Sequence, residues 1–376
     1  MTANRPSRHG RSRRPLVGLA LLPLLLAPLA ACGYGSDAED EEPASNNTAS
    51  GPALSADEVR IGYFANITHA TGVIGLENDG AIREELGGTE IRTQVFNAGP
   101  SAIEALNAGD LDITFIGPNP AINGFAGSGG QSLRIVAGAA SGGASLVVNP
   151  ETVTSLDDLE GKRIATPQLG NTQDVALLSY LNDQGLEVDP ESGRGDVSVL
   201  RIANSEIPAA FDGGDIDGAW VPEPTAANLV SRGAETLLDE GELWENGQYV
   251  VTHVIASQDF LAEHPDVVEA VVRGVVRTNA WINDNPDEAK TVFNEALGNL
   301  PGGNELPAEV LDPAFENVEF LNDPLAETLL VGAENATEVG LLDETDLTGI
   351  YDLSILNAVL AEEGLPEVED AGLGVG

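Results

Sequence analysis

Residues 214–224 read GDIDGAWVPEP, and residues 109–120 read the similar GDLDITFIGPNP. In both stretches an acidic Gly-Asp turn leads into a short apolar run that a Pro-x-Pro sequence ends. This pattern predicts a turn, a buried strand and a tight exit. Each copy follows a helix signal, because Ser101 and Glu104 have capping-box spacing and Asn204 opens the second helix. The repetition predicts two similarly built α/β lobes, with chance similarity between two common turn sequences as the alternative.

The first 31 residues have the pattern of an export signal. Five arginines precede an apolar segment, residues 16–31, that is too short to span a bilayer comfortably. Cys32, the only cysteine of the chain, follows a Leu-Ala-Ala sequence. This arrangement resembles a bacterial lipoprotein signal, in which Cys32 would carry a lipid that anchors the protein to the extracytoplasmic face of the cell membrane. An ordinary signal peptide with an incidental cysteine is the alternative, and an Arg-Arg pair resembles a twin-arginine export motif.

Residues 32–55 are predicted to form a disordered tether. Ser, Asp, Glu, Asn, Pro and Gly predominate from Gly33 to Leu54, with almost no large apolar side chain. Such a segment buries too little apolar surface to offset the entropy of folding. The folded part is therefore expected to begin near Asp57. With Cys32 assigned to the lipid, no cysteine is left for a disulfide.

The chain is strongly acidic. It carries 61 acidic and 17 basic residues, a formal net charge of −44. Such a charge argues against nucleic acid or an anionic membrane surface as a partner. We interpret it as a means of solvation, suited to a salty habitat, that costs self-repulsion at low ionic strength.

Strands and helices are predicted to alternate along the folded part. Val59–Phe64 has the alternation of a strand, and Gly72–Glu85 has the pattern of a helix. The β-rich segment Tyr249–Ala256 is expected to carry the chain back from the second lobe to the first. Alternating strands and helices favour mixed sheets flanked by helices. The predicted division is residues 56–140 for lobe 1, 141–250 for lobe 2, and 251–376 for the return to lobe 1 and the C-terminal helices.

Two polar loops are the best candidates for ligand contact. Residues 65–70 follow the first strand, and ligands of open α/β sheets bind at the carboxyl ends of strands. Residues 168–174 lead from a strand into the helix Val175–Leu181. The N–H groups and the positive dipole end of that helix would form an anion site. Ordinary capping of a surface helix is the alternative.

No catalytic or metal-binding pattern is present in the sequence. The four histidines have no spacing typical of a metal site. The sequence has no nucleophile elbow, phosphate-binding loop or dinucleotide fingerprint, so we predict neither an enzyme nor a cofactor. Two lobes and an export signal favour a binding protein instead, because clefts between domains are preferred sites for small molecules.

Several short segments, in their order along the chain, carry a resemblance to a known family. They are IGYF at 61–64, FNAGP at 96–100, EALNAG at 104–109, GPNP at 117–120, TPQLGNT at 166–172, WVPEP at 220–224 and ASQDF at 256–260. The run from Val59 to about Leu300 resembles the solute-binding proteins of ABC importers in the nitrate, taurine and aliphatic-sulfonate group. That group is a branch of the type II periplasmic-binding-protein fold.

The resemblance implies a two-lobe α/β protein, expected to be a monomer, that delivers a small anionic solute to a permease and an ATPase. Hydroxyls, amides and helix N-termini hold the acidic group in that family. Glu223 stands where sulfonate binders often carry Asp, and Phe64 where they tend to carry Gln. A carboxylate there would suit a ligand amine, while aromatic rings would pack its carbon skeleton. The predicted ligand-binding residues are Phe64, His69, Asn119, Ser141, Gln168, Asn171, Thr172, Trp220, Glu223 and Thr252.

Several alternatives remain open at the level of the sequence. Glu223 could be a solvated turn carboxylate, Trp220 a core residue, and His69 and His253 structural histidines. For the whole protein, one alternative is a thiamine-pyrimidine-precursor binding protein or enzyme of the same fold. Another is a sensor lipoprotein that serves no importer.

Overall fold

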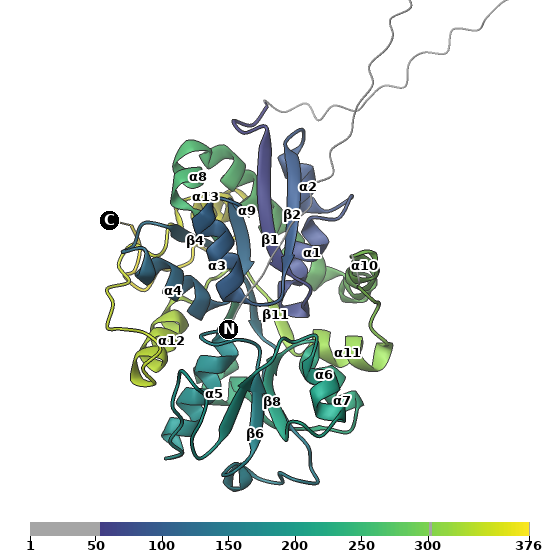
Figure 1. Ribbon diagram of the computed structural model, residues 1–376. Helices are drawn as coiled ribbons and strands as arrows, with labels where there is room; N and C mark the ends of the chain where they lie inside the picture. The colour runs from purple at the N-terminus through teal and green to yellow at the C-terminus, as the bar shows by residue number, and fades with distance from the viewer. Residues whose placement is uncertain (1–52, 301–302, 376) are drawn as a thin grey trace, which may run out of the picture. The chain divides into compact units, whose positions relative to one another are not determined.

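The computed structural model describes residues 53–300 and 303–375 (Figure 1). The predicted signal segment, Cys32 and most of the predicted tether lie outside the described residues. Ser55, at the end of the predicted tether, is already fixed, because its backbone N–H donates to Asp266 at 2.7 Å. The described chain forms two mixed β-sheets, each flanked by helices, so the predicted α/β fold class is confirmed.

The first sheet, which we call sheet A, has six strands in the order β11-β4-β10-β3-β1-β2. β1 pairs in parallel with β2 and β3, whereas β10 pairs antiparallel with β3 and β4. We call this sheet and its helices lobe 1. Its strands are β1 (Glu58–Phe64), β2 (Glu90–Phe96), β3 (Ile113–Ile116), β4 (Leu133–Gly142), β10 (Val250–Ser257) and β11 (Val318–Phe320).

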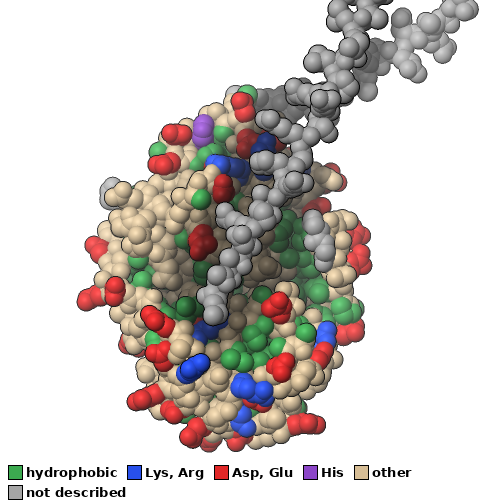
Figure 2. Space-filling model, in the orientation of Figure 1, with side chains coloured by type: hydrophobic (Ala, Val, Ile, Leu, Met, Phe, Trp, Pro, Cys, Tyr) green, Lys and Arg blue, Asp and Glu red, His purple; other side chains and the backbone are tan. Residues whose placement is uncertain are grey.

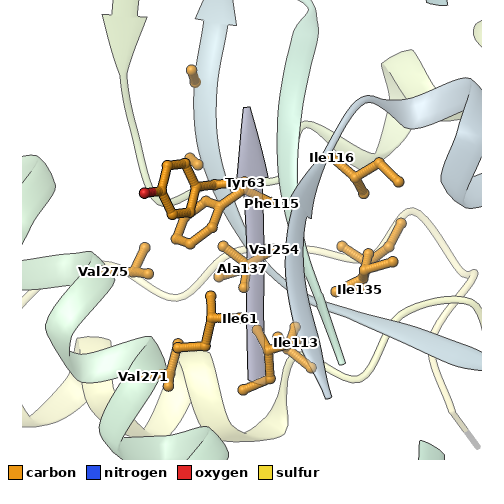
Figure 3. Close-up of a cluster of buried hydrophobic side chains, with 14 of the residues drawn as sticks. Ile61, Tyr63, Ile113, Phe115, Ile116, Ile135, Ala137, Val254, Val271 and Val275 are labelled. Atoms are coloured by element: carbon orange, nitrogen blue, oxygen red, sulfur yellow. The ribbon is translucent and has the colours of Figure 1, made fainter. Parts of the chain in front are cut away.

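Helices cover both faces of sheet A. Neighbouring residues of a strand point to opposite faces, and Phe115 of β3 lies against Gly72 whereas Ile116 lies toward Gly99. Figure 3 shows Phe115 on the side of Val271 and Ile116 on the other side of the strand. One face therefore carries α1 (Ala70–Gly75), α2 (Ala81–Leu86) and α9 (Pro265–Asp284), and the other α3 (Gly99–Ala108) and α4 (Pro118–Gly127).

The long helix α9 packs closely on α2. Its valines recur at helical spacing and are buried on one side. A Cβ placed on Gly274 would lie 2.4 Å from the Cα of Ile82, so the two backbones approach as closely as a glycine allows. The same buried cluster includes Ile61, Phe115 and Val275 (Figure 3). Lobe 1 thus supplies a rigid base for the loops at its strand ends.

The second sheet, sheet B, has five strands in the order β7-β6-β8-β5-β9, and with its helices we call it lobe 2. β6 pairs in parallel with β7 and β8, whereas β5 pairs antiparallel with β8 and β9. The strands are β5 (Ala144–Val148), β6 (Arg163–Thr166), β7 (Ser198–Arg201), β8 (Gly218–Pro222) and β9 (Glu235–Asp239). The helices are α5 (Thr172–Asp183), α6 (Ile207–Asp212) and α7 (Thr225–Ser231).

The two sheets share one topology. The order β2-β1-β3-β10-β4 in sheet A corresponds to β7-β6-β8-β5-β9 in sheet B, with one antiparallel strand at the fourth place in each. The repeated sequences 109–120 and 214–224 contribute β3 and β8, the third strands of these two orders. The sequence repeat therefore corresponds to a structural one.

Three local predictions were wrong. The segment predicted as one helix, Gly72–Glu85, is interrupted between α1 and α2. α3 begins two residues before Ser101, with Ala98 at its N-cap, because the Gly-Pro sequence can start the helix earlier. α6 has Glu206, not Asn204, at its N-cap.

The remaining helices follow β10 in the chain, and short 3₁₀ turns lie between the elements already described. They are the helices α8 (Gln258–Glu263), α10 (Pro286–Asn299), α11 (Ala308–Glu316), α12 (Ala326–Glu338) and α13 (Ser354–Glu362), with 3₁₀ turns at η1 (Ile67–His69), η2 (Leu156–Asp158), η3 (Glu240–Leu243) and η4 (Glu245–Gly247). Over residues 53–300 and 303–375, no helix combines the length and the apolarity that crossing a membrane requires.

Candidate ligand-binding site

A small pocket lies where loops of the two lobes meet. Its volume is about 20 Å³, which is room for about one water molecule. Its walls come from strand ends and helix starts, where ligands of α/β sheets bind. The lining residues are Phe64, Asn66, Thr68, His69, Asn97, Gly99, Gly117, Pro120 and Val251 of lobe 1, and Asn171, Thr172, Gln173, Asn204 and Pro222 of lobe 2.

The lobe 1 wall is built where β1 ends. Phe64 is the last residue of β1, and the chain then turns through η1, which carries Thr68 and His69. The rings of Phe64 and His69 lie 4.3 Å apart between centroids, at 30°. Burial lowers the pKa of His69 to about 3, so its imidazole is neutral near pH 7. The wall therefore offers an uncharged aromatic surface with a polar ring edge.

The lobe 2 wall is the start of α5, as predicted from the loop at 168–174. Asn171 is the N-cap, and its Oδ1 accepts a hydrogen bond from the backbone N–H of Gln173 at 3.0 Å. Behind it, the buried Asp174 accepts from Thr166 Oγ1 at 2.7 Å and from the N–H of Gly170 at 3.0 Å. These bonds fix the loop, so the first turn of α5 is held in place at the pocket.

Three helices begin at the pocket. Gly99 opens α3, Gly117 is the N-cap of α4, and Thr172 opens α5. A helix N-terminus carries a partial positive charge, although Pro100 in α3 and Pro118 and Pro120 in α4 supply no N–H group. The three starts together favour a negatively charged group.

The lobes lie close together at Gly117 and Thr172. A Cβ placed on Gly117 would lie 2.5 Å from Thr172 Oγ1. The backbone of Gly117 has φ −71° and ψ 159°, which any residue can adopt. The lack of space beside Thr172, and not the backbone conformation, therefore favours glycine at position 117. The side chain of Thr172 lies against the β3–α4 loop.

Three buried polar atoms of the lining have no hydrogen-bond partner among the described residues. They are His69 Nδ1, Thr172 Oγ1 and Asn204 Oδ1. His69 is 3% exposed and Thr172 is 7% exposed. Buried polar groups are nearly always hydrogen-bonded, and leaving one unpaired costs about 1–3 kcal/mol. A polar solute in the pocket would supply the missing partners.

Four of the ten predicted ligand residues line the pocket: Phe64, His69, Asn171 and Thr172. The other six do not. Trp220 is fully buried in the core of lobe 2, where its Nε1 donates to Glu240 at 2.7 Å. It was predicted to face the ligand, but both faces of β8 are covered.

Glu223 is buried beside the pocket rather than in its lining. Its Oε2 accepts from the N–H of Ala227 at 2.9 Å, and its Oε1 accepts from Asn317 Nδ2 at 2.8 Å. Its backbone carbonyl accepts from the N–H of Ile67 at 3.2 Å. Burial raises the pKa of Glu223. The carboxylate therefore joins α7 to the segment between α11 and β11, so the ligand-amine role predicted for it is not supported by its position.

The four remaining predicted residues lie outside the lining of the pocket. Asn119 Nδ2 donates to the carbonyl of Gly332 in α12 at 3.0 Å. Ser141 Oγ accepts a hydrogen bond from the N–H of Tyr249 at 3.2 Å, where the end of β4 lies beside the start of β10. Gln168 is half-buried in the loop before α5 and Thr252 is fully buried in β10, and neither lines the pocket.

Five polar lining residues were not named individually among the predicted ligand contacts, although three of them lie in the two loops predicted to contact the ligand. Asn66 and Thr68 lie in the loop after β1 that the sequence had singled out, so the strand end was a usable signal. Asn97 likewise follows β2, and Gln173 follows the N-cap of α5. Asn204 was interpreted as a helix cap instead.

Comparison with known proteins agrees with this architecture. Residues 53–296 match the model of the family described as NMT1-like. The chain is 29% identical over 212 residues to the taurine-binding periplasmic protein of Escherichia coli (strain K12). The aligned region covers 56% of this chain and 62% of that relative. The match thus spans less than two thirds of the relative's length.

Two solved structures share the fold. The alkanesulfonate-binding protein of Xanthomonas axonopodis pv. citri superimposes with a TM-score of 0.64 at 21% identity, covering 77% of this chain and 95% of that one. The periplasmic nitrate-binding protein of Synechocystis PCC 6803 gives a TM-score of 0.71 at 14% identity, covering 84% and 91%. Because the family model matches well over half of its residues, this chain belongs to the NMT1-like family and has the two-lobe fold of periplasmic binding proteins.

Proposed function

We propose that the protein is an extracytoplasmic solute-binding protein that captures a small anionic solute between its lobes and delivers it to an ABC permease and ATPase. The observation that carries the proposal is the pocket at the three helix starts, where His69 Nδ1, Thr172 Oγ1 and Asn204 Oδ1 have no partner within residues 53–300 and 303–375. Relatives and structural neighbours described as taurine-, sulfonate- and nitrate-binding proteins support this class of solute.

The proposed cycle involves opening and closing of the lobes. A pocket of about 20 Å³ is smaller than a sulfonate, so such a solute would enter after the lobes separate and be enclosed as they close. The chain crosses between the lobes at Gly142-Gly143 and again at Tyr249-Val250. These neighbouring crossings would serve as the hinge.

We further propose that the protein acts as a monomer tethered by a lipid on Cys32 through a flexible segment. The Leu-Ala-Ala-Cys sequence after an apolar run supports the anchor. Its role would be binding rather than catalysis, because the similar proteins above are described by what they bind. Mass spectrometry of the membrane-associated protein, with Cys32→Ser as the comparison, tests the lipid.

The solute class is tested by thermal unfolding of the purified protein in the presence of nitrate, alkyl sulfonates, taurine, small carboxylates and pyrimidines. A ligand at about 100 times its Kd adds about 2.7 kcal/mol, which raises Tm by several degrees. A shift with at least one anion is expected. A shift with a pyrimidine alone would replace the proposal by the thiamine-precursor alternative.

One substitution separates a ligand contact from a structural residue. Thr172→Val removes a buried hydroxyl that has no partner in the part of the chain that the structure describes, so the ligand-free protein should be as stable as wild type or more stable. The same change should weaken anion binding, because the ligand loses a hydrogen bond. Asn182→Ala, at the exposed far end of α5, is the control and should change neither. Unchanged affinity in Thr172→Val would remove this hydroxyl from the site.

A further inference from the structure

None of the described residues that line the pocket is an aspartate, glutamate, lysine or arginine, although the chain carries 61 acidic residues. Its polar side chains are amides, hydroxyls and the imidazole of His69, which is neutral near pH 7 because burial lowers its pKa. The helix starts at Gly99, Gly117 and Thr172 give this uncharged lining a positive potential. An anion is therefore favoured without any fixed cation, and a cationic group has no counter-charge.

Two carboxylates lie next to lining residues in the chain, and both are engaged. Glu223 follows Pro222, and its oxygens accept from Ala227 and Asn317 at 2.9 and 2.8 Å. Its side chain is held by α7 and by the segment after α11, so it would have to break two hydrogen bonds to reach a ligand in the pocket.

Asp174 follows Gln173 and is fully buried. Its Oδ1 accepts from Thr166 Oγ1 at 2.7 Å and from Arg201 Nε at 2.9 Å, and its Oδ2 accepts from the N–H of Gly170. The Arg201 side chain already pairs with this carboxylate. Asp174 thus serves the loop before α5 and leaves no unpaired charge for a ligand.

An ammonium group placed in this lining would be desolvated without an ionic partner. Several kcal/mol are lost when a charge is buried unpaired, and the helix dipoles add to the penalty. The same dipoles favour a sulfonate, nitrate or carboxylate. Two solutes with the same carbon chain that differ by one ammonium group should therefore bind very differently.

We infer that the pocket selects solutes that carry an anionic group and no cationic group, and that it discriminates against amino-sulfonates such as taurine. This inference rests on the proposed function and narrows its solute class. It sets this chain apart from its taurine-binding relative in spite of their 29% identity.

The test compares matched pairs by isothermal titration at pH 7. The pairs are ethanesulfonate with taurine and propionate with β-alanine, whose members differ by one ammonium group. In whichever pair binds, we expect the solute without the ammonium group to bind at least tenfold more tightly than its amine-bearing counterpart. Equal or tighter binding of the amine-bearing member overturns the inference while leaving the proposed function intact. Absence of binding by these four solutes and by nitrate overturns both.

Two variants sharpen the comparison. Asn97→Asp places a carboxylate in the lining, between β2 and α3. Because the Asn97 side chain is solvent-exposed, this substitution should change the stability of the fold little. It should improve the affinity for taurine relative to ethanesulfonate by at least tenfold. Glu223→Gln should weaken both members of a pair by the same factor, since it acts on the frame of the pocket. A selective loss of taurine binding in Glu223→Gln would contradict the inference.

Discussion

Asp217 accepts three hydrogen bonds from Arg163: from its backbone N–H at 2.9 Å and from Nε and Nη2 at 3.0 Å each. Asp112 accepts the same three from Arg60. In each lobe the arginine lies in the first parallel strand, and the aspartate ends the Gly-Asp-x-Asp turn before the third strand. The second aspartate of each repeat therefore ties its turn to the neighbouring strand.

Asp217→Asn should destabilise the protein by about 1–2 kcal/mol, less than a fully buried pair would, because Arg163 is partly exposed. Burial raises the pKa of Asp217, but the hydrogen bonds from Arg163 outweigh it and hold the pKa below its usual range. A depressed folded-state pKa gives stability that is present above the unfolded pKa and lost as the pH falls through the folded one. Urea denaturation should show the full difference at pH 7 and a smaller one near pH 3.

The control is Asp215→Asn, which changes the exposed first aspartate of the same turn. It should leave the free energy of unfolding within about 0.5 kcal/mol of wild type. Equal effects of the two substitutions would show that total charge, and not the pair with Arg163, is responsible.

Glu240 gives lobe 2 a pH-dependent stability. It is buried and accepts from Trp220 Nε1 at 2.7 Å, and burial raises its pKa from 4.5 to about 7. Between these values the folded protein holds a proton that the unfolded chain has lost, so this contribution falls as the pH rises. Relative to Glu240→Gln, wild type should lose about 3 kcal/mol of unfolding free energy between about pH 4.5 and 7.

The measurement is Tm of both proteins from pH 5 to 8. The difference between them is the informative quantity, because the buried histidines His69 and His253 have lowered pKa values and change stability in the opposite direction over much of this range. A difference that stays constant with pH would mean that Glu240 keeps an ordinary pKa.

Gly117→Ala should weaken solute binding by at least tenfold. The added Cβ would lie 2.5 Å from Thr172 Oγ1, which forces the two walls of the pocket apart. Gly127→Ala, at the other end of α4, is the matched control, because a Cβ there meets nothing within 4 Å. Titration of both variants with the same anion checks this. Equal affinities of the two variants would mean that the contact between Gly117 and Thr172 does not affect solute binding.

Added salt should raise Tm. Figure 2 shows acidic side chains spread over the visible face, with far fewer basic ones. At a net charge of −44, repulsion among them opposes the compact state and is screened as ionic strength increases. Thermal unfolding from low to molar NaCl should show a continuous rise. A flat response would mean that the charges are too far apart to matter.

The positions of the strands along the chain could largely be predicted from sequence, because acidic turns and apolar runs are local signals. Both copies of the repeat form a buried strand, β3 and β8, and both strands take the third place of the order that the two sheets share. Helix starts were less accurate. Ser101 lies inside α3 because Gly99 and Pro100 begin the helix before it, and a cap residue competes with any earlier start that the chain permits.

The pocket could be predicted only in part, because the sequence reveals where strands end but not which side chains converge there. Asn171 and Thr172 were found since a helix start has a recognisable pattern. Trp220 was assigned to the ligand because a strand-end aromatic can face a cleft or a core. Its partner in the core, Glu240, lies 20 residues away in the chain, beyond the reach of local patterns.

The position of β10 has a consequence for the order in which the protein is made. β10 lies between β3 and β4, yet the whole of lobe 2 precedes it in the chain. Until Val250–Ser257 is synthesised, two strands of sheet A present unpaired edges. Sheet B needs only residues 144–239, and no other lobe interrupts its strands in the chain. Lobe 2 can therefore finish folding before lobe 1, because lobe 1 begins earlier in the chain but lacks its central strand until β10 has been made.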